Sequence, residues 1–271
     1  MPHDITSFSN PLIKRVRSLR DKKHRKAEGL FIAEGLRIVT EASDAGHRPR
    51  YLIFSSDSEA HPLMQRLIAE TEAAGGTAVR TSRDILQKIS GKDNPQAVIG
   101  VFDDLKIQLS ALDRGAADIW IVAQALRDPG NLGTLLRTGD AVGAGGLILV
   151  DDCCDPFSVE AVRASMGAIF TQRVAVANWE DFLPWLRSGP GQLVGTSLNA
   201  TEDYRQPRYQ APVFVLMGNE KAGLPEAYEK ACDLLVRLPM RGRADSLNVS
   251  VAAGVMLYEV LNQLGEKPAR V

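Results

Sequence analysis

Residues 119–150 read IWIVAQALRDPGNLGTLLRTGDAVGAGGLILV. The apolar run over 119–123 predicts a buried strand, and the run over 147–150 predicts a second one. Residues 131–143 lie between them and are predicted to form a helix, with Pro129-Gly130 as the turn in front of it. A strand, a helix and a strand in this order predict two parallel strands joined by a crossover helix.

The same alternation continues to the end of the chain. Further strands are predicted at 173–177, 193–196, 213–217 and 234–238. Helices are predicted near 158–166, 179–187, 224–232 and 247–263. Short apolar strands separated by helices indicate an α/β fold, with a mostly parallel sheet that is covered on both faces.

The first half of the chain predicts a smaller α/β unit. Strands are expected at 51–54, 77–81 and 97–102, with helices at 62–74 and 83–89. Residues 103–117 are richer in Asp, Ser, Gly and Ala and are the expected linker. We therefore expect two domains, residues 1–105 and residues 117–271.

Basic charge is concentrated in residues 14–26, KRVRSLRDKKHRK. This segment holds eight of the 32 basic residues and one of the 33 acidic residues, so the rest of the chain has a net charge of −8. Asn10-Pro11 is a good helix start, and Leu12, Val16 and Leu19 form one apolar stripe behind the cations. The segment is either a phosphate-facing element or a solvated helix face, and composition alone favours neither.

Composition narrows the class of protein. Apolar residues make up 45% of the 271 residues and charged residues 24%, as in globular proteins that build a core. No apolar run approaches the roughly 18 residues of a membrane span. The start, Met1-Pro2-His3-Asp4, lacks the features of a secretory signal. Three cysteines and four scattered histidines indicate neither a disulfide framework nor a metal site. We therefore expect a cytoplasmic protein.

Polar residues gather where three predicted elements meet loops, over residues 124–140, 214–225 and 238–250. Asn131 is the expected cap of the helix after the first strand, and Arg137 follows six residues later. Gly218–Gly223 forms a polar loop bracketed by glycines, and Ser246 is the expected cap of the last helix. Capping and surface exposure would explain most of these residues, but not Asn248. The carboxyl edge of a parallel sheet is the usual ligand site in such folds.

These three stretches together resemble the signature motifs of the SpoU-type (TrmH-like) RNA ribose methyltransferases of the SPOUT superfamily. The first family motif is Asp-Pro-x-Asn-x-Gly-x-x-x-Arg, which residues 128–137 match. The second is Gly-x-Glu-x-x-Gly, matched by 218–223. The third is Pro-Met-x-Gly with Ser-Leu-Asn-Val-Ser close behind, matched by 239–242 and 246–250. One motif would be a weak signal, whereas all three in this order are a strong one.

The resemblance extends to the first domain and implies a fold. Phe31–Gly35 (FIAEG) and Asn94–Ala97 (NPQA) are similar to the family's substrate-binding domain, a small ribosomal-protein-like α/β unit that engages RNA. The basic segment 14–26 would then contact RNA phosphates. The family's SPOUT-type catalytic domain has a C-terminal trefoil knot, and family members are generally homodimers. Composition and periodicity predict neither the knot nor the dimer.

The resemblance also implies the activity, an S-adenosyl-L-methionine-dependent methylation of a ribose 2′-hydroxyl in RNA without a metal. Cofactor-binding residues carried over by motif position are Thr196, Leu216, Gly218, Leu238, Met240 and Leu247. The implied reaction site consists of Asn131, Arg137, Glu220, Ser246 and Asn248. Arg137 would either remove the hydroxyl proton or orient the ribose phosphate, and its usual protonation favours the second role.

Two alternatives to this expectation stay open. The separate first domain favours ribosomal RNA as substrate, but the same chemistry on transfer RNA is the alternative. A non-catalytic RNA-binding protein on the same scaffold is the other, although the polar residues of all three motifs are retained. Lys221 stands where glycine is common in the second motif, and Gly139 where alanine is common after the first. Neither change removes a polar group that the reaction requires.

Overall fold

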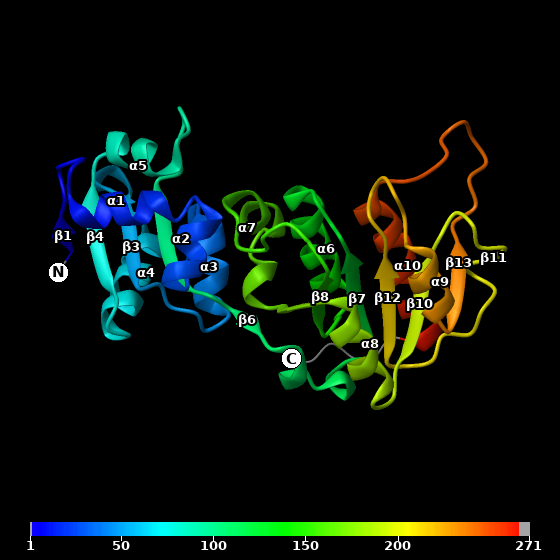
Figure 1. Cartoon of the computed structure of the whole chain (residues 1–271). Coiled ribbons are helices and arrows are strands. Elements are labelled where there is room, and N and C mark those ends of the chain that lie inside the picture. The colour runs from blue at the N-terminus through cyan, green and yellow to red at the C-terminus, as the bar shows by residue number, and fades with distance from the viewer. Residues whose placement is uncertain (1, 266–271) are drawn as a thin grey trace. The chain divides into compact units, whose positions relative to one another are not determined.

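The computed structural model describes residues 2–265, which form two compact units (Figure 1). The first unit combines the chain up to Leu105 with Asp155–Thr171, and the second combines Lys106–Cys154 with the chain from Gln172 on. Residues 155–171 fall by sequence order within the expected second domain, yet they pack with the first. Residue 1 and residues 266–271, the outer ends of the two expected domains, lie outside the described part.

The first unit is an α/β sandwich. Among its described residues it holds a five-stranded sheet in the order β1-β4-β3-β5-β2. In that order the strands are His3–Asp4, Thr77–Thr81, Tyr51–Ser55, Val98–Asp103 and Leu30–Glu34. The β1–β4 and β4–β3 pairs are parallel, and the β3–β5 and β5–β2 pairs are antiparallel. The helical segments are α1 (Pro11–Ser18), α2 (Lys22–Glu28), α3 (Leu36–Asp44), η1 (Ser56–Ser58), α4 (Pro62–Ala73), α5 (Arg83–Ser90), α7 (Val159–Ser165) and η4 (Ala168–Phe170).

The basic segment forms two helices, α1 and α2, rather than one. The stripe that faces the core is Ile13, Val16 and Leu19, whereas Leu12 is only partly buried. The buried guanidinium of Arg25 explains the break, because it donates from Nη1 to the carbonyls of Leu19 (2.7 Å) and Arg20 (2.6 Å) at the end of α1. One of the eight expected phosphate-facing cations therefore has a structural role.

The second unit confirms the expected α/β fold with a mostly parallel sheet. Its described residues form an eight-stranded sheet in the order β11-β13-β10-β12-β7-β8-β9-β6, and every pair in it is parallel. In that order the strands are Glu202–Asp203, Leu234–Arg237, Gln192–Thr196, Val213–Met217, Ile119–Gln124, Gly146–Val150, Arg173–Ala177 and Lys106–Ile107. The helical segments are η2 (Leu109–Ala111), η3 (Arg114–Ala116), α6 (Pro129–Ala141), α8 (Trp179–Arg187), α9 (Glu226–Ala231) and α10 (Val249–Leu264).

The central strands β12, β7 and β8 are buried along their whole length, so their apolar runs were strong sequence signals. Trp120 on β7 stacks on Phe214 of β12 with ring centroids 5.9 Å apart. The stretch expected as a linker is packed against this core, since the Trp120 indole donates to the Arg114 carbonyl at 3.0 Å and β6 extends the sheet. None of the described helices is long and apolar enough to cross a membrane.

Candidate active site

The first motif lies where β7 ends and α6 begins. Asp128, and not Asn131, caps α6, because its carboxylate accepts from the Asn131 backbone N–H at 2.7 Å. Pro129 then occupies the first helical position, where its missing N–H costs nothing. The expectation that Asn131 is the cap was wrong, and the correction has a consequence. The Asn131 side chain is left free to make contacts outside its own helix.

Asn131 joins the three motifs. Its amide Nδ2 donates to Glu220 Oε1 of the second motif at 3.4 Å. Its carbonyl Oδ1 accepts from Asn248 Nδ2 of the third motif at 3.0 Å and from the Ser250 hydroxyl at 3.4 Å. Residues more than 80 positions apart along the chain thus meet at one side chain. Ser250 had been quoted within the third motif, but no role was predicted for it.

The Glu220 carboxylate faces the start of α6. It accepts from the backbone N–H of Asp128 at 3.3 Å and of Arg127 at 3.5 Å, in addition to Asn131. A negative charge at this end of a helix is favourable, because the free N–H groups and the helix dipole are both positive there. The second motif is therefore held on the first electrostatically as well as through hydrogen bonds.

Asn219, which sequence reasoning did not single out, gives the second motif its shape. Its backbone N–H donates to the Gly223 carbonyl at 3.2 Å, and the Gly223 N–H donates back at 3.0 Å. Its side chain accepts from the N–H groups of Lys221 and Ala222 at 3.0 Å and donates to the Ala125 carbonyl at 2.8 Å. An Asn next to Gly in a polar turn is a recognisable signal for such self-bonding.

Gly218 and Gly223 are each needed for a different reason. A Cβ on Gly218 would lie 2.5 Å from the Gly223 carbonyl carbon, so a side chain there would push the loop open. Gly223 has a φ of +68°, in the left-handed region that glycine enters readily. The two glycines therefore let the loop fold tightly on itself at the wall of the second cavity described below.

The third motif ends in the cap of α10, which is Asn248 rather than the expected Ser246. Asn248 Oδ1 accepts from the backbone N–H of Ser250 at 2.9 Å and of Val251 at 3.4 Å. Ser246 lies two residues before this cap, is exposed, and donates to Asp245 Oδ1 at 3.2 Å. Asn248 is thus the cap of one helix and the partner of Asn131 on another.

Two adjoining cavities lie at these loops. The first, of about 540 Å³, is lined by the expected reaction residues Asn131, Glu220 and Asn248. The second, of about 350 Å³, is lined by Ser246 and by most of the expected cofactor residues, which are Thr196, Gly218, Leu238, Met240 and Leu247. Asn219, Glu220 and Lys221 line both cavities, so the two share a wall.

Two expected site residues line neither cavity. Leu216 is fully buried in β12, and its carbonyl accepts from the Thr196 hydroxyl at 3.4 Å. Its contribution is therefore to hold Thr196, which does line the second cavity. Arg137 lies on α6 with an exposed side chain, beyond the residues that line either cavity.

The two residues that depart from the family motifs are Lys221, which lies at the cavities, and Gly139, which is buried in α6. Lys221 adds a cation to the wall of both cavities. Gly139 is buried, and a Cβ there would lie 2.9 Å from Ile121 Cδ1 and 3.1 Å from Gln172 Oε1. Glycine at this position therefore leaves room for Ile121 and Gln172, which pack against α6 in this chain.

Asp151, which sequence reasoning also missed, braces the sheet edge behind the site. It follows β8 with a φ of +64° and accepts from the Tyr228 hydroxyl at 2.9 Å, Gln124 Nε2 at 3.2 Å and the Trp179 N–H at 3.0 Å. Tyr228 stacks on Trp179 with centroids 3.8 Å apart. One carboxylate thereby fixes α8, α9 and the end of β7. The first motif follows β7, and the second motif precedes α9.

The cysteines near the site are poor nucleophiles. Burial raises the pKa of Cys153 to about 11. Burial, with the nearby Cys153 and Glu220, raises the pKa of Cys154 to about 12. Since the thiolate is the reactive form, both side chains are unreactive near neutral pH. The site is instead built to position groups through amides and a carboxylate.

Comparison with known proteins agrees with this geometry. Residues 118–258 match the SpoU rRNA methylase family, and residues 10–100 match the MRM3-like substrate binding domain. The chain is 31% identical to an uncharacterized tRNA/rRNA methyltransferase of Synechocystis, over 96% of this chain and 93% of that protein. It is 27% identical to the 23S rRNA (guanosine(2553)-2′-O)-methyltransferase RlmP of Bacillus subtilis, over 94% of this chain and 98% of that protein.

A solved structure of an AdoMet-bound rRNA methyltransferase from Sinorhizobium meliloti is also similar. It is 40% identical, with a TM-score of 0.90, and the match covers 97% of this chain and 98% of that one. The fold and the site thus define an α/β RNA methyltransferase of the SPOUT superfamily. Within that class, the chain belongs to the SpoU rRNA methylase family.

Proposed function

We propose that this chain transfers the methyl group of S-adenosyl-L-methionine to a ribose 2′-hydroxyl, with ribosomal RNA as the substrate. The observation that carries the proposal is the junction of Asn131, Glu220 and Asn248 beside the second cavity. The relatives support it, because the Bacillus subtilis protein is named as a 23S rRNA 2′-O-methyltransferase and the Sinorhizobium meliloti structure as AdoMet-bound.

The second cavity suits the cofactor. Its volume of about 350 Å³ lies in the range of about 300–1,000 Å³ that is usual for small-molecule sites. Leu238, Met240 and Leu247 offer apolar contacts for an adenine ring. The close-packed backbone at Gly218 and the hydroxyl of Thr196 offer hydrogen bonds to polar groups. The residues present therefore fit a nucleoside with one apolar and one polar end.

The protein's part in the reaction is alignment and control of one proton. Bound S-adenosyl-L-methionine supplies a methyl group on a sulfonium, which is already activated for in-line displacement. Asn131 and Asn248 would hold the ribose at the first cavity, and Glu220 would fix Asn131. Positioning of this kind supplies much of the rate enhancement in transfers between two bound partners. Arg137 would orient the ribose phosphate or take the hydroxyl proton.

A homodimer would bring Arg137 close to a subunit interface. Leu247, Val251 and Tyr258 at and along α10 are 40%, 53% and 54% exposed, an unusual density of large apolar side chains for one surface. The helix α6, which carries Arg137, packs against α10. A second copy that covered α10 would place Arg137 near an interface. We further propose that the protein works in the cytoplasm, where ribosomal RNA would be its substrate.

The first unit would bind the substrate RNA and the second would carry out the transfer. The trefoil knot expected for the second unit stays a prediction. Transfer of labelled methyl groups to purified ribosomal and transfer RNA, followed by mapping of 2′-O-methyl sites, tests the function. Methylation of transfer RNA alone would replace the proposed substrate. Binding of RNA without binding of S-adenosyl-L-methionine in calorimetry would favour the non-catalytic alternative.

A further inference from the structure

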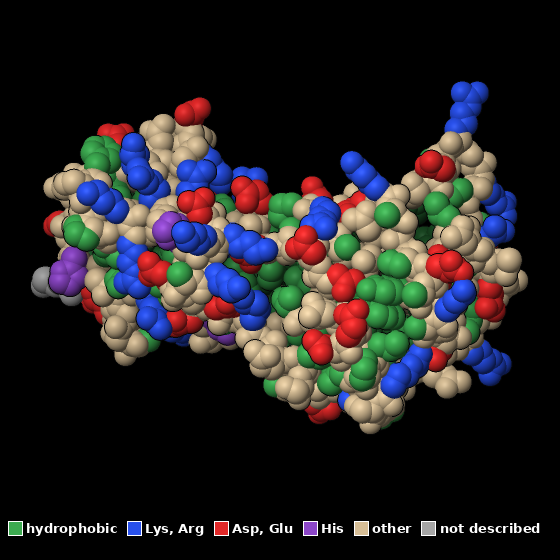
Figure 2. Space-filling view, viewed as in Figure 1, with side chains coloured by type: hydrophobic (Ala, Val, Ile, Leu, Met, Phe, Trp, Pro, Cys, Tyr) green, Lys and Arg blue, Asp and Glu red, His purple; other side chains and the backbone are tan. Residues whose placement is uncertain are grey.

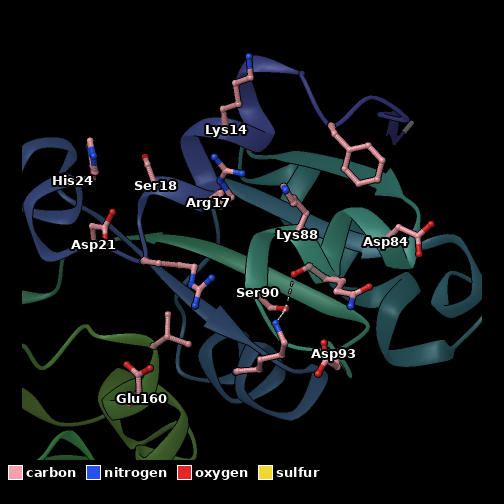
Figure 3. A pocket seen from close by; sticks show the side chains of 16 residues that line it. Lys14, Arg17, Ser18, Asp21, His24, Asp84, Lys88, Ser90, Asp93 and Glu160 are labelled. Carbon is pink, nitrogen blue, oxygen red and sulfur yellow. Dashed lines mark hydrogen bonds between the residues drawn. The ribbon is translucent and has the colours of Figure 1, made fainter.

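The first unit contains a cavity of about 990 Å³, and all of its lining residues belong to that unit (Figure 3). Its walls come from α1, the turn after α1, α2, α5, the residues after α5 and the start of α7, together with Phe8 before α1. The helices α1 and α5 pack against each other beneath it. Its lining cations are Lys14, Arg17, Arg20, Lys88 and Lys92.

Most of these cations lack a counter-ion. Among residues 2–265, Lys14, Arg17, Arg20 and Lys88 make no ion pair, and only Lys92 has one, with the buried Glu34. Outside the cavity, the neighbouring Lys22, Lys23 and Lys26 also make no ion pair among residues 2–265, whereas two arginines do. Arg15 pairs with Glu28 and Arg25 with Asp155. Unpaired positive charge therefore lies on four cations of the cavity and on the adjoining helix α2, and Figure 2 shows Lys and Arg side chains gathered over α1 and α2.

Carboxylates also line the cavity. Figure 3 shows Asp21, Asp84, Asp93 and Glu160 around the edge of the view, with Arg17 and Lys88 between them. Five cations and four carboxylates line the cavity, so the lining has a small positive net charge.

Arg20 is fixed against the turn after α5. A Cβ on Gly91 would lie 1.9 Å from Arg20 Nη1, so the guanidinium rests directly on the glycine backbone. Gly91 also has a φ of +64° and ends α5. A guanidinium held in place loses less side-chain entropy when it binds, and its planar donors match phosphate oxygens.

An aromatic side chain completes the cavity. Phe8 lines it and is 52% exposed. One exposed apolar residue is ordinary by itself. An exposed ring beside four unpaired cations is the combination that binds single-stranded nucleic acid, with phosphates on the cations and a base on the ring. A base inside a duplex cannot reach such a ring, because it is stacked and paired.

We propose that this cavity binds an unpaired nucleotide of the substrate RNA, with Arg17, Lys88 and Lys14 on phosphates and Phe8 on the base. The inference rests on the proposed function, in which RNA is the substrate. It adds the form of RNA that the first unit recognises, a single-stranded loop or end. The volume of about 990 Å³ leaves room for the nucleotide with its flanking phosphates.

The test is fluorescence anisotropy with the full chain, a short labelled single-stranded RNA and an RNA duplex of the same composition. Lys88→Ala should weaken single-strand binding and lower the slope of log affinity against log salt by about 0.7. Phe8→Ala should weaken it roughly ten-fold with an unchanged slope. Duplex binding should change much less in both variants.

Matched controls lie on the same unit outside the cavity. Arg37→Ala removes one charge from an arginine that is 71% exposed, and Leu63→Ala shortens an apolar side chain that is 38% exposed. Equal losses in the control and cavity variants, unchanged single-strand binding in the cavity variants, or equal losses with the duplex would each overturn the inference.

Methyl transfer to ribosomal RNA, measured on the same proteins, separates this inference from the proposed function. If the unmodified chain methylates ribosomal RNA while Phe8→Ala and Lys88→Ala bind single strands normally, the inference fails and the function stands. If the unmodified chain transfers no methyl group but the cavity variants lose single-strand binding, the function fails and the cavity assignment stands.

Discussion

Asn248 and Asn131 are joined by a 3.0 Å hydrogen bond, although 117 positions separate them along the chain. The same Asn248 side chain caps α10 through its carbonyl oxygen and contacts Asn131 through its amide. Each end of this one side chain thus has a separate task. Helix capping fixes the oxygen, and the fixed oxygen aims the amide at the first motif.

The two tasks can be separated by substitution. Asn248→Ala should lower the free energy of unfolding by about 1 kcal/mol, because the cap is lost. Asn248→Ser keeps a capping oxygen and should stay within about 0.5 kcal/mol of the unmodified chain, since Ser and Asn cap similarly well. Both variants lose the amide, so both should show slower methyl transfer at saturating cofactor. Denaturant unfolding and single-turnover assays measure the two effects, and full activity in the serine variant would contradict the assignment.

The sequence predicted the sheet and the Asn10 cap of α1 well, but the caps of α6 and α10 wrongly. Strands β7, β8 and β12 are buried on both faces, so their apolar runs were unambiguous. Asp128 and Asn131 are both good capping residues, three positions apart, and either could start a helix. Pro129 favours Asp128 as the cap, because proline is common at the first position of a helix. The two-residue strands β1, β6 and β11 have no periodicity to detect.

The polar residues of the site were predicted from motifs, whereas the residues that hold those motifs in place were not. Roles for Glu220 and Asn248 could be predicted because each residue stands inside a short motif of the family that the chain resembles. Asp151 could not, because its three donors come from β7, α8 and α9, and only the folded chain brings them together. The role of Asn219 could be predicted only in part. Its turn is formed by neighbouring residues, whereas its hydrogen bond to the Ala125 carbonyl depends on the folded chain.

Gly218→Ala should weaken cofactor binding. The added Cβ would lie 2.5 Å from the Gly223 carbonyl carbon, so the loop that lines the second cavity must open. We expect the affinity for S-adenosyl-L-methionine, measured by calorimetry, to fall by about ten-fold or more, because overpacking of this kind costs roughly 1–3 kcal/mol. Gly115→Ala is the matched control, since its Cβ would find Asp113 Oδ1 at an acceptable 3.4 Å. Equal affinities for both variants would refute the role of the loop.

Arg137→Ala should nearly abolish methyl transfer while cofactor binding changes little. Arg137 lines neither cavity of its own chain, so its loss should leave the proposed cofactor cavity intact, whereas the proposed role toward the ribose phosphate or the reacting proton would be lost. Calorimetry with the cofactor and single-turnover transfer should therefore diverge. Arg127, whose side chain pairs with Asp152 at the first cavity, offers a comparison at which loss of charge should have a smaller effect. Preserved turnover with weakened cofactor binding would exclude the proposed role.

Asp151→Ala should destabilise the second unit by about 3 kcal/mol. Three donors would lose a charged acceptor, and hydrogen bonds to charged groups are worth about 1.5–3 kcal/mol each before the structure relaxes. Alanine at a φ of +64° would add strain of about 1 kcal/mol. Asp151→Asn keeps an acceptor and tolerates this φ, so its loss should be clearly smaller. Denaturant unfolding checks both variants, and equal stabilities would show that the carboxylate is not a brace.

Cys232 should make the protein less stable as the solution becomes alkaline. Burial, with the nearby Asp233, raises the pKa of its thiol to about 12, whereas an unfolded chain has a cysteine pKa of about 8.5. Above the lower value the unfolded chain releases the proton and the folded chain keeps it, so stability falls as pH rises toward the higher value. The slope due to this thiol is about 1.4 kcal/mol per pH unit. Unfolding of the unmodified chain and of Cys232→Ala between these pKa values should therefore differ in slope, and parallel curves would show that the thiol ionises freely in the folded protein.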